Sequence, residues 1–232
     1  VKQIRRLNPE SCVDDKKDIN ILRNRMFYEA EQTLLKNKDT NIAFIEAPTG
    51  AGKSNLAMNC SLKLLDKNIN KIFYVYPFNT LVEQNYDTLE KIYGQTDIFK
   101  SIAVINSITP IPLNGTRKFW ENLDIEENEK FYQKALLDRQ FLNYPFILTT
   151  HVNLFQIMFG CEREAAISFY QLAGSVVVLD EIQSYKNVLW TEIMMFLQCY
   201  SRLLNMKIII MSATLPKLDM LTGNHEKVVN LI

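Results

Sequence analysis

The chain has 232 residues, of which 47% are hydrophobic and 22% are charged. This composition is typical of a soluble globular protein, and it excludes intrinsic disorder, collagen and a coiled coil. The length allows one large domain or two small ones. The 26 basic and 26 acidic side chains cancel, so the sequence lacks the basic surface of a dedicated nucleic-acid binder. Any contact with nucleic acid is therefore expected to be local.

The four cysteines are far apart in the sequence and form no CxxC pair. We expect reduced thiols and no structural zinc site. The N-terminal Val-Lys-Gln-Ile-Arg-Arg is not followed by the apolar segment of a signal peptide. No apolar stretch approaches the length of a membrane span. These features predict a soluble, cytoplasmic domain without membrane contact.

The first 18 residues are polar and are interpreted as a linker or tail, with one domain over 19–232. Apolar residues recur at helical spacing over 19–36. The pattern then predicts a strand at 41–46, a helix at 54–66, a strand at 71–76 and a helix at 80–93. Residues 102–105 are a further strand candidate.

The segment 107–144 is the least readable part of the chain, because two prolines and a glycine precede an acidic helix expected near 125–142. We treat it as a candidate insertion for partner docking or as a surface helix. The alternation resumes with strands at 146–149, 175–179 and 207–211, and with helices from 152 and at 188–205. Apolar strands alternating with helices predict a mostly parallel sheet with helices on both faces. The predicted fold class is α/β.

Glycine is scarce, at seven of 232 residues, yet two glycines lie in Ala47-Pro-Thr-Gly-Ala-Gly-Lys-Ser54. This segment fits the phosphate-binding loop, with Ala47 in place of the usual first glycine. Small residues let successive backbone N–H groups surround a phosphate, and the following helix points its positive end at the anion. A turn without ligand is the alternative, but the strand before and the helix after favour a P-loop that binds ATP. The predicted ATP-binding residues are Pro48, Thr49, Gly50, Ala51, Gly52, Lys53 and Ser54.

An acidic partner for this loop follows the apolar strand Ser-Val-Val-Val-Leu as Asp180-Glu181. Open α/β sheets bind ligands at the carboxyl ends of their strands. Asp180 and the Ser54 hydroxyl are expected to hold Mg²⁺, and Lys53 is expected to contact the β- and γ-phosphates. Glu181 is expected to orient and deprotonate the attacking water, so Lys53 and Glu181 are the predicted catalytic residues. A strand that simply exits to solvent is the alternative.

A third element is Met211-Ser-Ala-Thr-Leu-Pro216, directly after the last predicted strand. Ser212 and Thr214 are two residues apart, which puts both hydroxyls on one side of an extended chain. They could hydrogen-bond toward the acidic pair and couple it to a neighbouring domain. A helix-capping turn is the alternative.

Together the three segments resemble motifs I, II and III of superfamily-2 helicases, which lie on a RecA-like P-loop NTPase domain. The chain is more closely similar to the CRISPR-associated helicase–nuclease of type I systems. The residues that carry this resemblance are Glu46-Ala-Pro-Thr-Gly-Ala-Gly-Lys-Ser54, Tyr76-Pro-Phe-Asn-Thr80, Thr149-Thr-His-Val-Asn-Leu-Phe155 and Leu179-Asp-Glu-Ile-Gln-Ser-Tyr185. The resemblance covers residues 19–222.

The resemblance implies roles for further residues. The two segments that match strand-contacting motifs supply nucleic-acid-binding candidates, which are Pro77, Phe78, Asn79, Thr80, Thr149, Thr150 and His151. Short hydroxyl side chains and backbone N–H groups at strand ends contact phosphates without reading bases. For the Thr149–His151 segment, a helix cap is the alternative. Gln183 would couple the nucleotide state to the grip on the strand, with a simple surface amide as its alternative.

Superfamily-2 motors also use a second RecA-like domain, whose arginine fingers are worth roughly 10³–10⁵ in rate. No arginine of this chain matches one, so we expect weak ATP binding and slow or no hydrolysis by the chain alone. An HD nuclease, which the related family often carries, is expected outside this chain, upstream or on a separate polypeptide, because His151 and His225 are too few for its metal site. No motif identifies the adenine contacts, for which Arg23, Arg25 and Gln32 are candidates.

The sequence therefore predicts the first RecA-like motor domain of an ATP-dependent single-stranded DNA translocase or helicase of CRISPR interference, using ATP and Mg²⁺. By resemblance, its partners are single-stranded DNA and a guide-RNA effector complex that displaces a strand, and movement is 3′-to-5′. Two alternatives remain: another superfamily-2 DNA or RNA helicase, and a nucleotide-dependent binding switch without translocation. An ABC-type ATPase is disfavoured, because no Leu-Ser-Gly-Gly signature precedes Asp180.

Overall fold

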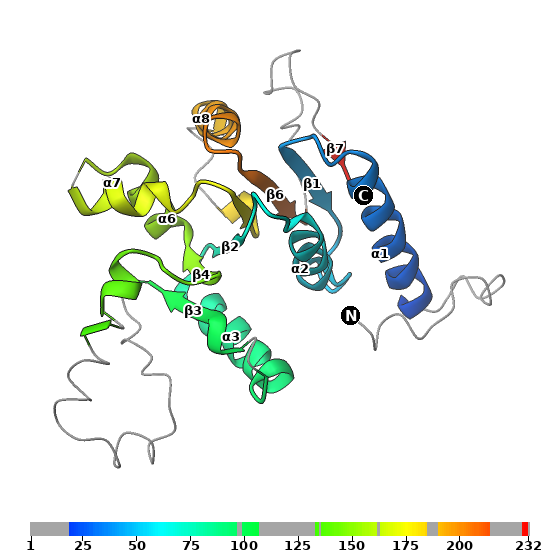
Figure 1. Cartoon of the computed structure of the whole chain (residues 1–232). Helices are drawn as coiled ribbons and strands as arrows, with labels where there is room; N and C mark the ends of the chain where they lie inside the picture. The colour runs from blue at the N-terminus through cyan, green and yellow to red at the C-terminus, as the bar shows by residue number, and fades with distance from the viewer. Residues whose placement is uncertain are drawn as a thin grey trace. The chain divides into compact units, whose positions relative to one another are not determined.

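Figure 1 shows the computed structural model of the chain. The structure describes residues 19–96, 99–106, 133–134, 136–161, 163–184, 190–213 and 229–231. The chain divides into two compact units, which are described one at a time. The first unit comprises residues 1–69 and 176–232, and the second comprises residues 70–175. Over the described ranges, every helix is too short or too polar to cross a membrane.

The first unit is built on parallel strands. Its strands are β1 (Ile42–Glu46), β5 (Ser175–Leu179), β6 (Lys207–Ser212) and β7 (Val229–Asn230), in the order β5-β6-β1-β7. β6 pairs with β1 from Ile42↔Ile208 to Glu46↔Ser212, and with β5 on its other edge. The side chains of β1, β5 and β6 are almost all apolar and buried, as in parallel strands covered on both faces.

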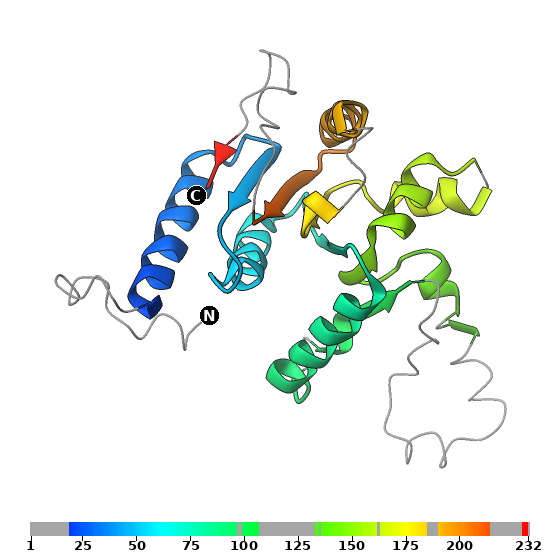
Figure 2. The same ribbon diagram turned by 180° about the vertical axis from the view of Figure 1, so that it is seen from behind.

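Three helices cover these strands: α1 (Ile19–Lys36), α2 (Lys53–Leu64) and α8 (Trp190–Leu203). α2 and α8 pack on β6, and Figures 1 and 2 show them on opposite sides of it. α1 packs against α2, where Lys63 Nζ lies 3.0 Å from Glu31 Oε1. A short 3₁₀ turn, η4 (Ile182–Ser184), follows β5.

The second unit has three parallel strands in the order β3-β4-β2. They are β2 (Lys71–Tyr76), β3 (Ile102–Ile105) and β4 (Phe146–Thr150). α3 (Asn79–Tyr93) packs on all three strands, α6 (His151–Phe159) packs on β2 and β4, and α7 (Arg163–Tyr170) packs on α6. A 3₁₀ turn, η3 (Phe99–Ser101), precedes β3. The carboxyl ends of β2 and β4 are in register, with Tyr76 opposite Thr150.

The predicted α/β class is confirmed, because every described strand pairing is parallel and strands alternate with helices. Apart from the helix expected near 125–142, the expected strands and helices lie within a few residues of their observed bounds. β7 was not expected, since a two-residue strand carries no periodic signal. The N-terminal segment 1–18 and most of 107–144 lie outside the described residues.

The helix α2 offers a matched test of this packing. Leu56 is completely buried, whereas Leu62 on the same helix is 43% exposed. We expect Leu56→Ala to lower the free energy of unfolding by about 2–5 kcal/mol, because it removes apolar contacts and leaves a cavity. Leu62→Ala should change it by less than about 1 kcal/mol. Urea unfolding followed by circular dichroism measures both, and equal losses would contradict the burial of Leu56.

Candidate functional site

The first unit brings the predicted nucleotide-binding residues to the carboxyl ends of β1, β5 and β6. The loop after β1 leads directly into α2, whose N-cap is Gly52. Gly50 has a φ of 79° and Gly52 a φ of 91°, which is the left-handed region that side chains other than glycine rarely adopt. A Cβ atom at either position would meet open space. The two glycines are therefore required by the backbone conformation and not by crowding.

Lys53 is the most deeply placed charge of this loop, with 6% of its surface exposed. Its Nζ donates a hydrogen bond of 2.7 Å to the Ala47 carbonyl and lies 3.9 Å from Glu181 Oε1. The Ala47 N–H in turn donates to the Ser212 carbonyl at 3.3 Å. The ammonium is thus held inside the curve of the loop, and the loop is held against the end of β6. A buried ammonium needs such partners, and an incoming phosphate would be a stronger one.

Asp180 is buried at the end of β5. Its burial, together with the repulsion of the neighbouring Glu181 carboxylate, raises the pKa of its carboxyl from 3.8 to about 6. A hydrogen bond from the Glu181 backbone and the charge of Lys53 act in the opposite direction. The carboxylate therefore lacks full compensation for its burial, and groups with such shifted pKa values cluster at functional sites.

Glu181 and its neighbours form a hydrogen-bonded chain. Glu181 has a φ of 46°, a left-handed backbone that costs a non-glycine residue about 1 kcal/mol. The Gln183 side-chain amide donates to Glu181 Oε2 and accepts a hydrogen bond from the Ser212 hydroxyl. Gln183 therefore bridges Glu181 and the end of β6. Its expected coupling role stays a prediction. Thr214, predicted beside Ser212, lies outside the described residues.

The residues present fit a bound nucleotide with Mg²⁺. Gly50 and Gly52 border open space, and the Lys53 ammonium is held beside the same loop. The buried Asp180 carboxylate, whose charge is only partly compensated, provides the acidic side of the site. Ser54 is exposed on the first turn of α2. Hydroxyl and carboxylate oxygens are the ligands that Mg²⁺ prefers.

One residue of this site has a contact that sequence reasoning missed. Arg23, considered above only for adenine, donates a hydrogen bond of 2.6 Å from Nη2 to the Gly50 carbonyl and another of 3.3 Å from Nη1 to Asn20. Arg23 therefore attaches the phosphate-binding loop to α1 through the Gly50 carbonyl. Arg23 and Gly50 are 27 residues apart, and no periodic pattern or motif in the sequence links them. Only the packing of α1 against α2 reveals this contact.

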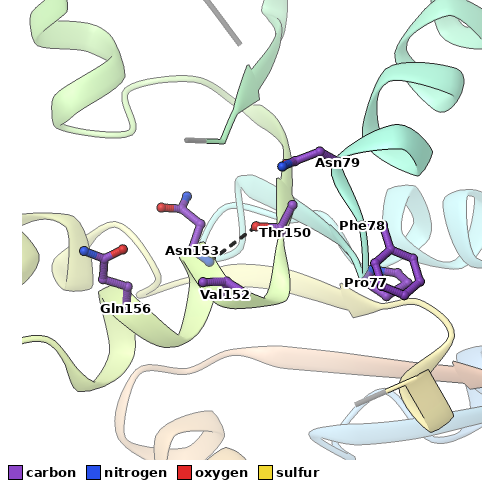
Figure 3. Close-up of a pocket in the computed structure, with 7 residues that line it drawn as sticks. All are labelled: Pro77, Phe78, Asn79, Thr150, Val152, Asn153 and Gln156. Carbon is purple, nitrogen blue, oxygen red and sulfur yellow. Dashed lines mark hydrogen bonds between the residues drawn. The ribbon is translucent and has the colours of Figure 1, made fainter. Parts of the chain in front are cut away.

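The first group of predicted strand-contacting residues lies between β2 and α3 in the second unit. Phe78 is the N-cap of α3, and its side chain is 58% exposed. No side-chain cap bonds the first turn of this 15-residue helix. The Leu81 N–H donates to the Phe78 carbonyl at 3.2 Å, which leaves the N–H groups of Asn79 and Thr80 as candidates to bind an anion. Pro77 is buried and Thr80 is exposed. Pro77, Phe78 and Asn79 line a pocket together with Thr150 (Figure 3).

The second group differs from expectation. Thr149 is 1% exposed, and its hydroxyl donates to the Ile105 carbonyl at 2.6 Å. The expected contact of this side chain with a nucleic-acid backbone is therefore incompatible with its burial. The Thr150 hydroxyl accepts from the Asn153 N–H at 3.4 Å, which is the helix-cap alternative. The signal that sequence reasoning underused is Asn153, whose amide also bonds Thr149 at 2.9 Å.

His151 is half-buried at the start of α6 and hydrogen-bonds the backbone at Tyr76 and Pro77. Burial lowers the pKa of its imidazole below 6.5, although the two backbone bonds oppose this shift. The ring is therefore neutral at pH 7 and brings no positive charge to a phosphate. The hydrogen bonds of this ring connect the start of α6 to the turn after β2.

The three described cysteines are not among the residues of these sites. Cys60 is buried, and burial with the nearby Glu31 raises the pKa of its thiol to about 12. Cys161 and Cys199 are exposed free thiols, and Cys12 lies outside the described residues. Across the part of the chain that the structure describes, no three His, Cys, Asp or Glu side chains are grouped to hold a metal ion.

The raised pKa of Asp180 has a consequence for stability. The unfolded carboxyl ionises near pH 3.8 and the folded one near pH 6, so stability falls as the pH rises through this window. Above pH 7 the loss amounts to about 3 kcal/mol. We expect Asp180→Asn to raise the thermal unfolding midpoint at pH 7.5 without nucleotide or Mg²⁺, and to raise it less at pH 5.

The control for this experiment is Asp87→Asn, which changes an exposed carboxylate on α3. It should leave the unfolding midpoint unchanged at both pH values. Differential scanning fluorimetry in EDTA measures all three proteins. If Asp180→Asn lowered the midpoint at pH 7.5, the ionised carboxylate would be stabilising and its burial would not be the dominant effect.

Solved structures with a similar fold include several helicases. The DUF1998 helicase MrfA matches with a TM-score of 0.56 and 17% identity, over 99% of this chain and 32% of that chain. MrfA bound to DNA and AMPPNP matches with a TM-score of 0.55 and 20% identity, over 88% and 26%. A hypothetical ATP-dependent RNA helicase from Sulfolobus tokodaii matches with a TM-score of 0.52 and 15% identity, over 99% and 56%. These likenesses show the fold.

Comparison of the sequence with curated proteins finds the CRISPR-associated nuclease/helicase Cas3 of Haloferax volcanii, which is 23% identical over 188 residues. The match covers 76% of this chain, but the chain spans only 19% of that protein's length. The sequence profile of the DEAD/DEAH box helicases matches residues 28–221, which includes the phosphate-binding loop, the Asp180-Glu181 pair and the end of β6. This chain therefore belongs to the DEAD/DEAH box helicase family.

Proposed function

We propose that residues 19–232 are the first RecA-like motor domain of an ATP-dependent translocase that moves along single-stranded DNA in CRISPR interference. The observation that carries this proposal is the assembly of Lys53, Asp180 and Glu181 at the ends of parallel strands, with Gln183 linking Glu181 to Ser212. The 23% identity to the archaeal CRISPR-associated nuclease/helicase supports the CRISPR role.

Hydrolysis of ATP would use the residues of the first unit in distinct ways. The loop N–H groups and the Lys53 ammonium would bind the phosphates and offset the charge that develops during transfer. Glu181, 3.9 Å from that ammonium, would orient a water and accept its proton. Ser54 and Asp180 would hold Mg²⁺, which supplies further positive charge for the phosphate oxygens. Gln183 would transmit a change at Glu181 to β6 through Ser212.

The grip on the strand would come from the second unit. The uncapped start of α3 offers N–H groups to a phosphate, and Asn79 and Thr80 flank it. Thr150 contributes at the start of α6, where its hydroxyl can still accept or donate one further bond. Such contacts are local, which accounts for strand binding by a chain of zero net charge. The DNA-bound structure of MrfA supports a nucleic-acid partner for this fold.

A second RecA-like domain would complete the motor by supplying arginine fingers, and a guide-RNA effector complex would deliver the displaced strand. The nuclease of such a system would reside outside these residues. The second candidate function is an RNA helicase, and it is favoured by the likeness to the Sulfolobus tokodaii protein, an ATP-dependent RNA helicase by name.

The nucleotide site can be tested with two substitutions that separate binding from hydrolysis. Lys53→Ala should weaken binding of a fluorescent ATP analogue by at least about tenfold, since it removes the buried ammonium. Glu181→Gln should leave binding within about twofold and lower turnover by roughly 10²–10⁴-fold, because an amide cannot accept the proton. Fluorescence titration with Mg²⁺ measures binding by the 232-residue chain.

Turnover is measured on the same chain and on the full-length gene product, each with and without single-stranded DNA. We expect DNA to stimulate hydrolysis only where a second RecA-like domain is present, by roughly 10³-fold or more. Robust DNA-stimulated turnover by the 232-residue chain would contradict this expectation. Tight nucleotide binding without turnover by either protein would favour a binding switch over a motor.

The choice between DNA and RNA is tested by competition. A labelled 20-nucleotide DNA single strand bound to the full-length protein is challenged with unlabelled DNA or RNA of the same sequence, or with duplex DNA. The proposal expects the DNA single strand to compete best, because the target is a displaced DNA strand. Preferential competition by RNA would support the RNA-helicase candidate.

A further inference from the structure

A pocket of about 240 Å³ lies at the carboxyl ends of β2 and β4 in the second unit (Figure 3). Residues 77–79 form one wall and members of the segment 150–156 form the other. The pocket is smaller than the 300–1,000 Å³ typical of drug-sized ligands. It therefore suits a single ring and not a whole nucleoside triphosphate.

The pocket wall is neutral and partly apolar. Phe78 and Val152 are both exposed large hydrophobic residues, and Figure 3 shows the Phe78 ring beside Pro77 at one end of the pocket. None of the described side chains that line the pocket carries a charge. A phosphate group favours cationic partners, so the side chains of this wall are better suited to an uncharged, flat ligand.

One polar atom of the wall lacks a hydrogen bond. Asn79 Oδ1 is buried and has no hydrogen-bond partner among the described residues. Figure 3 shows the Asn79 side chain extending from α3 toward Thr150, with the amide nitrogen at its visible end. In contrast, the Asn153 amide is occupied by Thr149 Oγ1 at 2.9 Å and the Ile105 carbonyl at 3.3 Å. A buried acceptor without a donor is unfavourable, because it has lost its hydrogen bonds to water without replacing them. A ligand with an N–H group would relieve this deficit.

We propose that this pocket receives one unstacked base of the bound single strand, with Phe78 as the stacking surface and Asn79 Oδ1 as the acceptor for a base amine. The proposal rests on the strand-binding function proposed above, and it adds base contacts to a grip otherwise made through phosphates. Aromatic side chains commonly stack the bases of single strands. The exposed Phe78, placed directly before the uncapped start of α3, puts the ring next to the phosphate-binding N–H groups.

The acceptor predicts a preference among bases. Cytosine carries an exocyclic amine where thymine carries a carbonyl oxygen. Asn79 Oδ1 would accept from the cytosine amine, but it would face oxygen on thymine. A strand of cytosines should therefore bind more tightly than a strand of thymines with the same number of phosphates.

The test measures binding of three fluorescent 12-mers to the full 232-residue chain by anisotropy. The strands are oligo-dC, oligo-dT and a strand of abasic sites with the same phosphates. We expect the wild type to bind oligo-dC about three- to tenfold more tightly than oligo-dT, and the abasic strand most weakly. Phe78→Ala should weaken both base-bearing strands about tenfold and leave the abasic strand within twofold.

Two further variants separate stacking from hydrogen bonding. Phe78→Trp should retain the affinity for oligo-dC, because it keeps an aromatic face. Asn79→Ala should remove the preference for oligo-dC over oligo-dT, so that the two strands bind with equal affinity. The matched control is Tyr170→Ala, an exposed aromatic residue on α7 that does not line the pocket. It should bind all three strands like the wild type.

The outcomes distinguish the two proposals. If the wild type binds all three strands equally and Phe78→Ala has no effect, the base pocket is wrong and a phosphate-only grip remains. The base pocket is equally wrong if Phe78→Ala weakens the abasic strand as much as the others. If the wild type binds none of the strands, the proposed strand-binding function fails, and the base pocket fails with it.

Discussion

The buried ammonium of Lys53 is the constraint on which the rest of the nucleotide site depends. A charge with 6% exposure requires partners inside the protein, and the nearest are the Ala47 carbonyl and the Glu181 carboxylate. To reach them, the chain must curl between β1 and α2, which in turn requires left-handed backbone at Gly50 and Gly52. The Ala47 N–H then ties this curl to β6. The curl of the loop and its contacts with Glu181 and β6 thus all serve to accommodate one buried positive charge.

The nucleotide site could be predicted from the sequence because each of its parts is a contiguous segment at the end of an apolar strand. The segments before Lys53 and Asp180 are apolar, and parallel pairing brings their carboxyl ends to one edge. The sequence pattern therefore predicted both which residue types the site has and where in the sheet they lie. The α/β class followed from the same alternation, and the DEAD/DEAH family match covers the same segments.

The availability of the candidate strand-contacting residues was harder to predict, because some of their side chains are hydrogen-bonded to neighbours distant in the sequence. Thr149 points inward because β3 presents the Ile105 carbonyl to it across the pairing of β3 with β4. A sequence motif shows that a hydroxyl group is present, but it does not show which backbone group will form a hydrogen bond with it. The Arg23 contact with Gly50 has the same origin, since it depends on how α1 packs against α2. Local pattern determines the elements, and long-range packing determines which polar atoms remain available.

The left-handed backbone of Glu181 is a local cost of the fold at the residue proposed to activate water. A glycine at this position would relax the backbone, and removal of the Glu181 carboxylate would relieve its repulsion on Asp180. The same change would take away the carboxylate that lies 3.9 Å from the buried Lys53 ammonium and the acceptor of the Gln183 amide. Attempts to stabilise this chain for crystallography should therefore leave position 181 unchanged, because the gain in backbone freedom is opposed by the loss of both contacts.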